Sequence, residues 1–274
     1  MKDSKKRERL DLLLMERYPG LTRSRARAEI MAGRVYVNGE RCTKPGMAYP
    51  PDAAIDLRER ELRYVSRGGI KLAGALADLD LPVKGLSVLD VGASTGGFTD
   101  CLLQHGARRV IALDVGYGQL AWELRRHRQV TVLERCNVRY LQPGDLPWEP
   151  HLAVADLSFI SLKLVLPVLK ENRIPAVLAL VKPQFEVGRD AAGRGKGVIR
   201  DPQLHRDVLN GLAAFACGIG YCIMGCSYSR LPGPRGNLEY FVHWRLQEEG
   251  CVCPEGLEGE LDSIVGKAHR ELAR

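Results

Sequence analysis

Two charged residues directly follow apolar segments that are typical of buried strands. Asp156 ends the segment A-V-A-D, and Lys182 follows the apolar run Val177–Val181 and precedes Pro183, an unusual place for a solvated lysine. In an open parallel sheet the carboxyl ends of the strands converge on the ligand crevice, so the carboxylate and the amine are expected to meet there. Such a pair can hold or move a proton at a reacting hydroxyl. The spacing predicts that the two residues are close, without assigning their roles.

Two further charged residues, Lys71 and Glu239, are candidates for the same chemistry. Lys71 lies in S-R-G-G-I-K-L before the first helix of the larger part of the chain, and Glu239 lies in G-N-L-E-Y at the start of the last expected strand. Taken alone, either residue is more often half of a surface ion pair. Their role therefore depends on what surrounds them.

A glycine-rich turn follows a predicted strand in L-D-V-G-A-S-T-G-G-F, residues 89–98. Glycines permit positive φ and close approach to a ligand, and the amides that open the next helix can bind a carboxylate or phosphate. The spacing is not the dinucleotide pattern G-x-G-x-x-G, because Ser94 stands at the second glycine. The alternative is an ordinary strand-to-helix turn. The residues expected to bind a ligand here are Asp90, Gly92, Ala93, Ser94, Thr95, Gly96, Gly97 and Phe98.

The acidic strand ends indicate the kind of ligand. Asp90 suits a cationic head, such as the amino group of S-adenosylmethionine. Asp114, followed by Val115, ends the next predicted strand, at about the 20-residue distance at which a doubly wound fold binds the hydroxyls of a ribose. A loop carboxylate without a ligand is the alternative for Asp114. Both residues favour a ligand that combines a cationic group with a ribose.

The elements that must position these residues alternate between strands and helices after residue 70. Alternating units of this kind predict a parallel, doubly wound sheet, and the loop P-G-P-R-G-N predicts an antiparallel final pair. This is the architecture of class I methyltransferases, an α/β, Rossmann-like fold with a seven-stranded sheet. The expected strands are Ser87–Val91, Arg109–Asp114, Val130–Leu133, Leu152–Asp156, Ala176–Val181, Tyr221–Ser229 and Leu238–Leu246.

Composition excludes several classes of protein. The 274 residues are 45% hydrophobic, which is enough for a sizeable core, and the longest apolar stretch, 162–181, is interrupted by charges and prolines. No segment is typical of a membrane span or an export signal, so we expect a cytoplasmic protein without a membrane partner. Its eight cysteines are expected to stay reduced. No cysteine pair has C-x-x-C spacing, so no metal site is predicted.

The net charge of +7 is concentrated at the N-terminus, where residues 1–70 contain 16 Lys and Arg against 10 Asp and Glu. This excess predicts a polyanionic partner, either nucleic acid or an anionic membrane surface. The basic residues expected to contact RNA are Arg9, Arg23, Arg25, Arg27, Arg34, Lys44 and Arg67. The alternative is that the arginines only form a solvated helix face.

Local patterns predict a small α/β unit around these arginines. Apolar spacing predicts a helix over Arg9–Tyr18 and a second one from Thr22 to Gly33, with Ala26, Ala28 and Ile30 facing inward. A strand over Arg34–Val37 and the hairpin turn Asn38-Gly39 follow. We expect a small RNA-binding domain over 1–63, a linker over 64–69, a catalytic domain over 70–250 and a tail over 251–274.

These motifs resemble known families. R-L-D-L-L-L, S-R-A-R-A, G-R-V-Y-V-N-G and K-P-G, in this order, resemble the RNA-binding domain named after ribosomal protein S4, over about residues 7–66. With the motifs above, D-V-G-Y-G-Q-L-A-W, A-D-L-S-F-I-S-L and V-K-P-Q-F-E-V-G, the chain resembles the TlyA family over about residues 7–246. That family comprises S-adenosylmethionine-dependent ribose 2′-O-methyltransferases of ribosomal RNA, historically called hemolysins, with an FtsJ/RrmJ-like catalytic domain.

The resemblance implies a function and a catalytic set. The family's Lys-Asp-Lys-Glu tetrad matches Lys71, Asp156, Lys182 and Glu239, and implies methyl transfer to the ribose 2′-OH of cytidine in 16S or 23S rRNA. Lys182 would act on the hydroxyl, Lys71 would supply a neighbouring positive charge, and the carboxylates would hold the amines and the ribose in line. Ribosomal RNA or ribosomal subunits are the implied partner. A membrane-active cytolysin and a non-catalytic RNA-binding assembly factor remain the alternatives.

Overall fold

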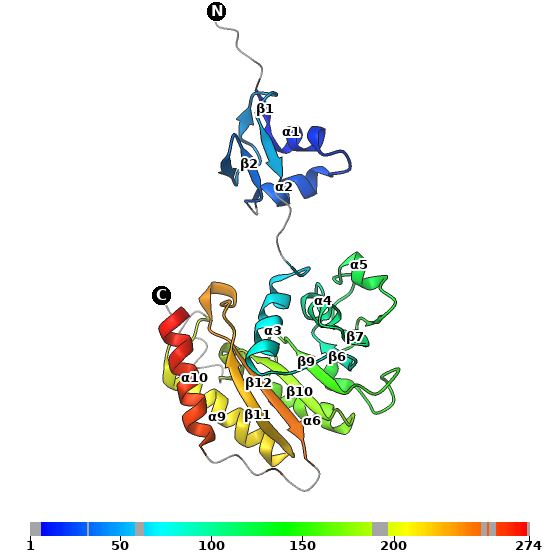
Figure 1. Ribbon diagram of the computed structural model, residues 1–274, viewed down its shortest axis with the longest axis vertical. Helices are drawn as coiled ribbons and strands as arrows, with labels where there is room; N and C mark the ends of the chain where they lie inside the picture. Colours follow the sequence, from blue (N-terminus) through cyan, green and yellow to red (C-terminus); the bar gives the residue numbers. More distant parts are fainter. Residues whose placement is uncertain are drawn as a thin grey trace, which may run out of the picture. The chain divides into compact units, whose positions relative to one another are not determined.

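The computed structural model describes residues 7–31, 33–57, 63–187, 197–247, 251 and 256–272 (Figure 1). The chain divides into two compact units, Met1–Glu61 and Leu62–Arg274. No helix in the described ranges is long and apolar enough to cross a membrane.

The first unit packs two helices on small antiparallel sheets. Its helices are α1 (Leu10–Arg17) and α2 (Arg23–Met31), and its three-stranded sheet has the order β3-β2-β5. Leu10, Leu13 and Leu14 of α1 are buried with Ala26 and Ile30 of α2 in the core between helices and sheet, whereas Leu12 is exposed. The strands are β1 (Glu8–Arg9), β2 (Val35–Val37), β3 (Glu40–Cys42), β4 (Ala48–Tyr49) and β5 (Ile55–Leu57), with β1 paired to β4.

Local signals in this unit are confirmed, with one correction. Thr22 caps α2, since its Oγ1 accepts a hydrogen bond of 3.3 Å from the Arg25 amide. Asn38 and Gly39 both have positive φ, 51° and 83°, as a tight hairpin turn requires. The prediction that Ala28 faces inward is wrong, because it is exposed and Glu29 is buried instead. Arginine partners allow this carboxylate to be buried.

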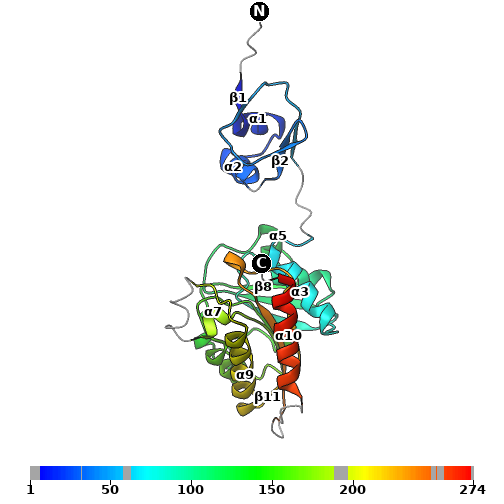
Figure 2. The same ribbon diagram turned by 90° about the vertical axis from the view of Figure 1, so that its left-hand side faces the viewer.

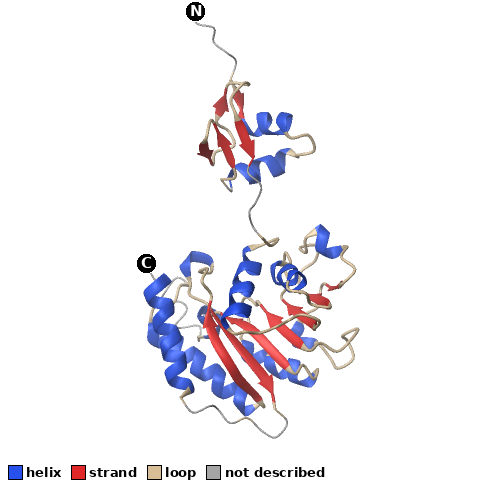
Figure 3. Cartoon of the chain, viewed as in Figure 1, coloured by secondary structure: helices blue, strands red, loops and turns tan. Residues whose placement is uncertain are grey.

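The second unit contains a seven-stranded sheet with the order β11-β12-β10-β9-β6-β7-β8 (Figure 3). The five strands from β10 to β8 pair in parallel, whereas β12 is antiparallel to both of its neighbours, β10 and β11. This confirms the predicted class I methyltransferase architecture. The strands are β6 (Ser87–Val91), β7 (Arg109–Leu113), β8 (Val130–Leu133), β9 (Leu152–Ala155), β10 (Ala176–Val181), β11 (Tyr221–Tyr228) and β12 (Tyr240–Leu246).

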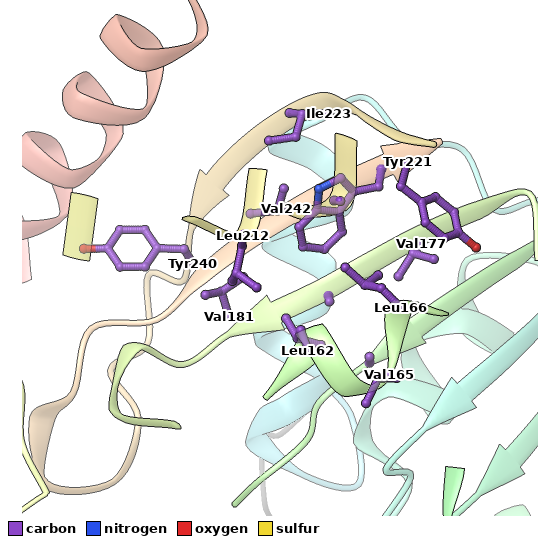
Figure 4. Close-up of a cluster of buried hydrophobic side chains, with 14 of the residues drawn as sticks. Leu162, Val165, Leu166, Val177, Val181, Leu212, Tyr221, Ile223, Tyr240 and Val242 are labelled. Atoms are coloured by element: carbon purple, nitrogen blue, oxygen red, sulfur yellow. The ribbon is translucent and has the colours of Figure 1, made fainter. Parts of the chain in front are cut away.

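Helices cover both faces of this sheet, as alternating side chains of the strands require (Figure 2). Val88, Val110 and Val154 face α3 (Arg67–Asp78) and α4 (Gly97–Gln104). The next residues along the strands, such as Leu89 and Ile111, face the opposite core, where side chains of β10, β11 and β12 gather with those of the helices (Figure 4). The helices of that face are α6 (Leu166–Glu171), α9 (Pro202–Gly218) and α10 (Leu257–Leu272); shorter helices are α5 (Trp122–Arg125), α7 (Pro183–Glu186), η1 (Val138–Tyr140), η2 (Leu162–Leu164) and η3 (Pro234–Gly236).

Two expectations about the C-terminal region need correction. The residues after 250 are not merely a tail, because Leu261, Val265 and Ala268 of α10 are buried in the main core. The eight cysteines are not all reduced, since Cys222 of β11 forms a disulfide with Cys251, with their Cα atoms 5.3 Å apart. The fold brings this pair together without any spacing motif that the sequence could show.

Candidate active site

Asp156 and Lys182 meet at the carboxyl edge of the sheet. They directly follow β9 and β10, which are parallel neighbours. Lys182 Nζ lies 2.6 Å from Asp156 Oδ1 and donates a hydrogen bond of 3.1 Å to Ser158 Oγ. The predicted proximity of the two residues is therefore observed, and the amine is held by an ion pair with Asp156 and a hydrogen bond to Ser158.

Lys71 and Glu239 form the second ion pair of this edge, with Nζ 2.5 Å from Oε2. The Glu239 side chain is fully buried and Lys71 is 10% exposed, so this is not a surface pair. Burial raises the pKa of Glu239, while Lys71 and Lys182 lower it and Asp156 raises it. The four charged residues therefore act on one another electrostatically.

The antiparallel strand β12 is what brings Glu239 to this edge. The register pairs Val181 of β10 with Tyr240 of β12. The next residue beyond each of these, Lys182 and Glu239, therefore lies at the same end of the strand pair. An antiparallel strand enters the sheet at the edge where its parallel neighbours end.

Glycines allow Lys71 to reach the site, because the start of α3 packs directly on the glycine-rich turn. A Cβ on Gly69 would lie 2.8 Å from the backbone oxygen of Gly97 and would overlap Tyr64. A Cβ on Gly97 would overlap Ser66 Oγ. The S-R-G-G and T-G-G segments are thus in backbone contact, and Lys71 lies two residues after Gly69, inside α3 and not before it as predicted.

Two adjoining cavities lie along this edge. The larger, of about 650 Å³, is lined by Gly92, Ser94, Asp114 and Val115 among the predicted ligand residues. The smaller, of about 190 Å³, is lined by Gly92, Ala93, Ser94, Thr95, Gly97 and Phe98, together with Ser66 and Lys182. Asp156 and Ser158 border both cavities. The Lys182–Asp156 pair therefore lies where the two spaces meet.

Two predicted ligand residues do not line these cavities. Gly96, with φ of 94°, packs on Leu120 and Leu124 instead. Asp90 is fully buried beneath the turn, where its Oδ2 accepts a hydrogen bond of 2.6 Å from Thr99 Oγ1. Its Oδ1 has no hydrogen-bond partner among the described residues. Asp90 can therefore act on a ligand through its charge, from behind the cavity wall.

The residues present fit S-adenosylmethionine. Asp114 accepts backbone hydrogen bonds from Ser94 (2.7 Å) and Gly116 (2.6 Å), and each carboxylate oxygen keeps a further lone pair for a ribose hydroxyl. The buried, half-satisfied carboxyl of Asp90 is suited to a nearby cationic group. These two features match the nucleoside and the amino acid halves of the cofactor.

The stability of this unit is expected to depend on the ionisation of Asp90. Burial raises its pKa to about 7, whereas a carboxyl in the unfolded chain ionises near pH 4. Between about pH 4 and pH 7, Asp90 is ionised in the unfolded chain but still protonated in the folded protein. The free energy of unfolding therefore falls as the pH rises through this range. Asp90→Asn keeps an oxygen that can accept the hydrogen bond from Thr99, but it cannot ionise, so its stability does not fall with pH for this reason. Its unfolding free energy in urea, relative to wild type, should rise by about 1 kcal/mol per pH unit between pH 5 and 7. A constant difference over that range would contradict a raised pKa.

Several cavity residues are not predicted from the sequence. Asn137 and Arg139 follow β8, and Ser158 and Phe159 follow Asp156. The rule that strand ends bind ligands points to the loop after β8 (Val130–Leu133), but Asn137 lies further along this loop than Asp114 lies from β7, so the rule does not single it out. Phe159 is 90% exposed with φ of 65°, and the centre of its ring lies 4.9 Å from that of Phe185. No spacing pattern indicates an exposed aromatic residue at a cavity mouth.

The predicted RNA-binding residues of the first unit fall into two groups. Arg9 and Arg23 contact the buried carboxylate of Asp11, at 2.9 and 3.5 Å, and Arg25 and Arg34 pair with Glu29. The hydrogen bond from Arg9 lowers the pKa of Asp11, so these pairs help to hold the fold. Arg27 and Lys44 are exposed and form no ion pair among the described residues, whereas Arg9, Arg23 and Arg25 are exposed but paired.

Two of these arginines, Arg23 and Arg27, line a groove on α2. It has a volume of about 680 Å³ and is lined by Arg23, Ser24, Arg27, Ala28 and Met31. Arg67, the last predicted RNA-binding residue, belongs to the second unit instead. There it opens α3 and donates a hydrogen bond of 3.1 Å to the carbonyl of Pro232, in the loop that precedes Glu239.

Comparisons with known proteins agree with this geometry. The sequence model of FtsJ-like methyltransferases matches residues 64–246, and that of the S4 domain matches residues 8–55. The chain is 46% identical to the 16S/23S rRNA (cytidine-2′-O)-methyltransferase TlyA of Mycobacterium tuberculosis, over 96% of this chain and 98% of the relative. It is 38% identical to Hemolysin A of Brachyspira hyodysenteriae, over 82% and 95% of the two chains.

A solved structure gives the same result. A Streptococcus thermophilus protein described as a hemolysin superposes with a TM-score of 0.76 and 40% identity, over 98% of both chains. Both the name TlyA and the name hemolysin therefore occur among full-length relatives, as the resemblance of the motifs predicted. The chain belongs to the TlyA family of FtsJ-like methyltransferases with an S4 domain.

Proposed function

We propose that this protein uses S-adenosylmethionine to methylate the ribose 2′-OH of cytidine in ribosomal RNA. The observation that supports it most is the Lys182–Asp156 pair, in which Asp156 borders both the nucleoside-sized cavity and the smaller cavity, and Lys182 lines the smaller one. Relatives named as rRNA (cytidine-2′-O)-methyltransferases align with the chain over nearly its whole length. Ribosomal RNA as substrate makes the cytoplasm the place of action.

The residues of the site can assist the removal of the proton from a ribose hydroxyl. Bound S-adenosylmethionine supplies the methyl group as an electrophilic sulfonium. A 2′-OH is too weak an acid to lose its proton unaided at neutral pH, so the attacking oxygen needs a base or a cation at close range. In this proposal Lys182 contacts that oxygen, and Asp156 and Ser158 hold the amine in place.

The second ion pair has a supporting role in this proposal. Lys71 is tied to a fully buried carboxylate, so its position is fixed by Glu239 and not by solvent. Its charge reinforces that of Lys182 where negative charge develops on the oxygen. The exposed ring of Phe159, at the mouth of the larger cavity, is suited to stack on a base that has left its helix.

The decisive experiment is methyl transfer with a defined RNA substrate. Purified protein would be incubated with labelled S-adenosylmethionine and with separated ribosomal subunits or naked rRNA, and methylated riboses would be mapped by arrest of reverse transcription. We expect label at one or a few cytidines. Cofactor binding without label in any RNA would contradict the proposal.

Arg27 is expected to contribute one phosphate contact. It is exposed and lines the α2 groove, whereas Arg17 on α1 donates its hydrogen bond to the carbonyl of Pro51. Arg27→Ala should weaken RNA binding about threefold to tenfold at 0.1 M salt and lower the salt slope by about 1. Arg17→Ala removes the same charge and serves as the control. If Arg27→Ala and Arg17→Ala lose the same amount of RNA affinity, the α2 groove has no special role in RNA binding.

A further inference from the structure

Trp122 is an exposed indole in a protein whose other tryptophans are packed. It is the first residue of α5 and is 65% exposed. Trp244 is fully buried, and the ring of Trp148 is covered by the guanidinium of Arg109, 4.1 Å away. An indole combines a large apolar ring with a polar N–H, and exposed tryptophans are enriched at binding interfaces for that reason.

A basic side chain lies against this indole. The guanidinium of Arg126 lies 5.3 Å from the centre of the Trp122 ring, and a second exposed cation, Arg128, follows two residues later in the chain. Within the described ranges neither Arg126 nor Arg128 forms an ion pair, whereas Arg125 is held by Glu134. The acidic residue of the helix itself is the exposed Glu123. We call Trp122, Arg126 and Arg128 the α5 patch.

The apolar residues next to the α5 patch are not available to a partner. Leu120 and Leu124 are buried in a small core with Ala93 and Ala112, on the side that faces the glycine-rich turn. A membrane-binding helix presents a continuous apolar face, but here a single indole would enter the lipid. A flat ring beside a guanidinium that forms no ion pair among the described residues fits an unstacked nucleobase with its phosphates instead.

We propose that the α5 patch binds an unpaired nucleotide of the RNA substrate, with the base stacked on Trp122 and its phosphates near Arg126 and Arg128. This inference rests on the proposed function for its substrate. The patch is on the element that supports the cofactor turn, since the Ala121 amide donates a hydrogen bond of 3.2 Å to the Thr95 carbonyl. RNA held there is therefore anchored to the same element as the cofactor.

Kinetics with three variants test the stacking. Trp122→Ala should raise the KM for RNA about tenfold. The kcat and the affinity for S-adenosylmethionine should stay within twofold of wild type. Trp122→Phe keeps a ring and should restore most of the loss. Met224→Ala removes another half-exposed apolar side chain, from β11, and is the control that should leave KM unchanged.

Tryptophan fluorescence distinguishes RNA binding at Trp122 from a purely structural role of this residue, because RNA would quench the emission only if it contacts the ring. A single-stranded RNA oligonucleotide should quench the tryptophan emission of the wild type and of Met224→Ala, and quench Trp122→Phe far less. Quenching does not depend on catalysis, so it tests RNA binding at the α5 patch even if no RNA is methylated. A failure of the proposed function would therefore be distinguishable from a failure of this inference. Equal quenching in Trp122→Phe, or an unchanged KM in Trp122→Ala of an active enzyme, would overturn the inference. Trp122-dependent quenching by anionic lipid vesicles and not by RNA would also overturn it, in favour of a membrane surface.

Discussion

Replacing Lys182 with alanine is expected to lower methyl transfer by roughly 10²–10⁴-fold, the range typical of a lost proton-transfer or charge-stabilising group. The side chain is only 10% exposed and its amine is held by Asp156 and Ser158, so solvent that enters in its place would lack both the charge and the fixed geometry. The rate would be measured under single turnover with labelled cofactor, to separate chemistry from RNA release.

The same variant should still bind the cofactor, which distinguishes a chemical role from a structural one. Lys182 lines the smaller cavity and not the larger one, so titration calorimetry should give a cofactor affinity within a few-fold of wild type. Lys170→Ala removes an exposed lysine from α6 and controls for the loss of one positive charge. A Lys182→Ala enzyme with the wild-type rate would remove Lys182 from the mechanism.

Gly92→Ala is expected to disrupt the cofactor turn and the Asp156 strand end together. Gly92 has φ of 86°, and a Cβ there would lie 2.7 Å from the backbone oxygen of Asp156 and 3.1 Å from Leu157 Cδ2. The first contact is with backbone and cannot be relieved by a rotamer change. We expect a loss of about 2–4 kcal/mol in the free energy of unfolding and more than a tenfold loss of cofactor affinity.

Gly118→Ala provides the matched comparison. Gly118 also has positive φ, 72°, but no atom lies within 4 Å of the place that an added methyl group would occupy, so the variant experiences conformational strain without a clash. It should lose about 1–2 kcal/mol of stability in urea unfolding and bind the cofactor normally. If both variants bind the cofactor equally well, the close approach of Gly92 to Asp156 is not what shapes the turn.

The sequence predicts these residues at parallel strand ends well, because a short continuous apolar run marks a buried strand and the next polar residue marks its end. This rule locates Asp156 and Lys182, and in the structure Lys182 Nζ lies 2.6 Å from Asp156 Oδ1. Lys71 and Glu239 are different. Their pairing depends on glycine contacts at the start of α3 and on the register that sets Tyr240 against Val181, and neither leaves a local pattern. For this pair the sequence offers only the resemblance to a family.

Other features escape prediction for related reasons. Helical spacing alone cannot show that Glu29 is buried in preference to Ala28, because one of the two arginines that neutralise it, Arg34, lies beyond the end of the helix. The disulfide between Cys222 and Cys251 joins residues 29 positions apart through the fold of the C-terminal region. Exposed residues such as Phe159 and Trp122 have no apolar periodicity, so they become visible only as exceptions to burial.

The pair of Lys71 and Glu239 has a consequence for how the protein is made. The two residues are 168 positions apart, one at the first helix of the unit and the other beside the last strand to enter the sheet. A growing chain that has not yet delivered β12 can form the strands of the cofactor cavity but lacks one of the four charges of the site. Because domains fold as units during synthesis, the activity is expected to appear only when translation of this unit is nearly finished.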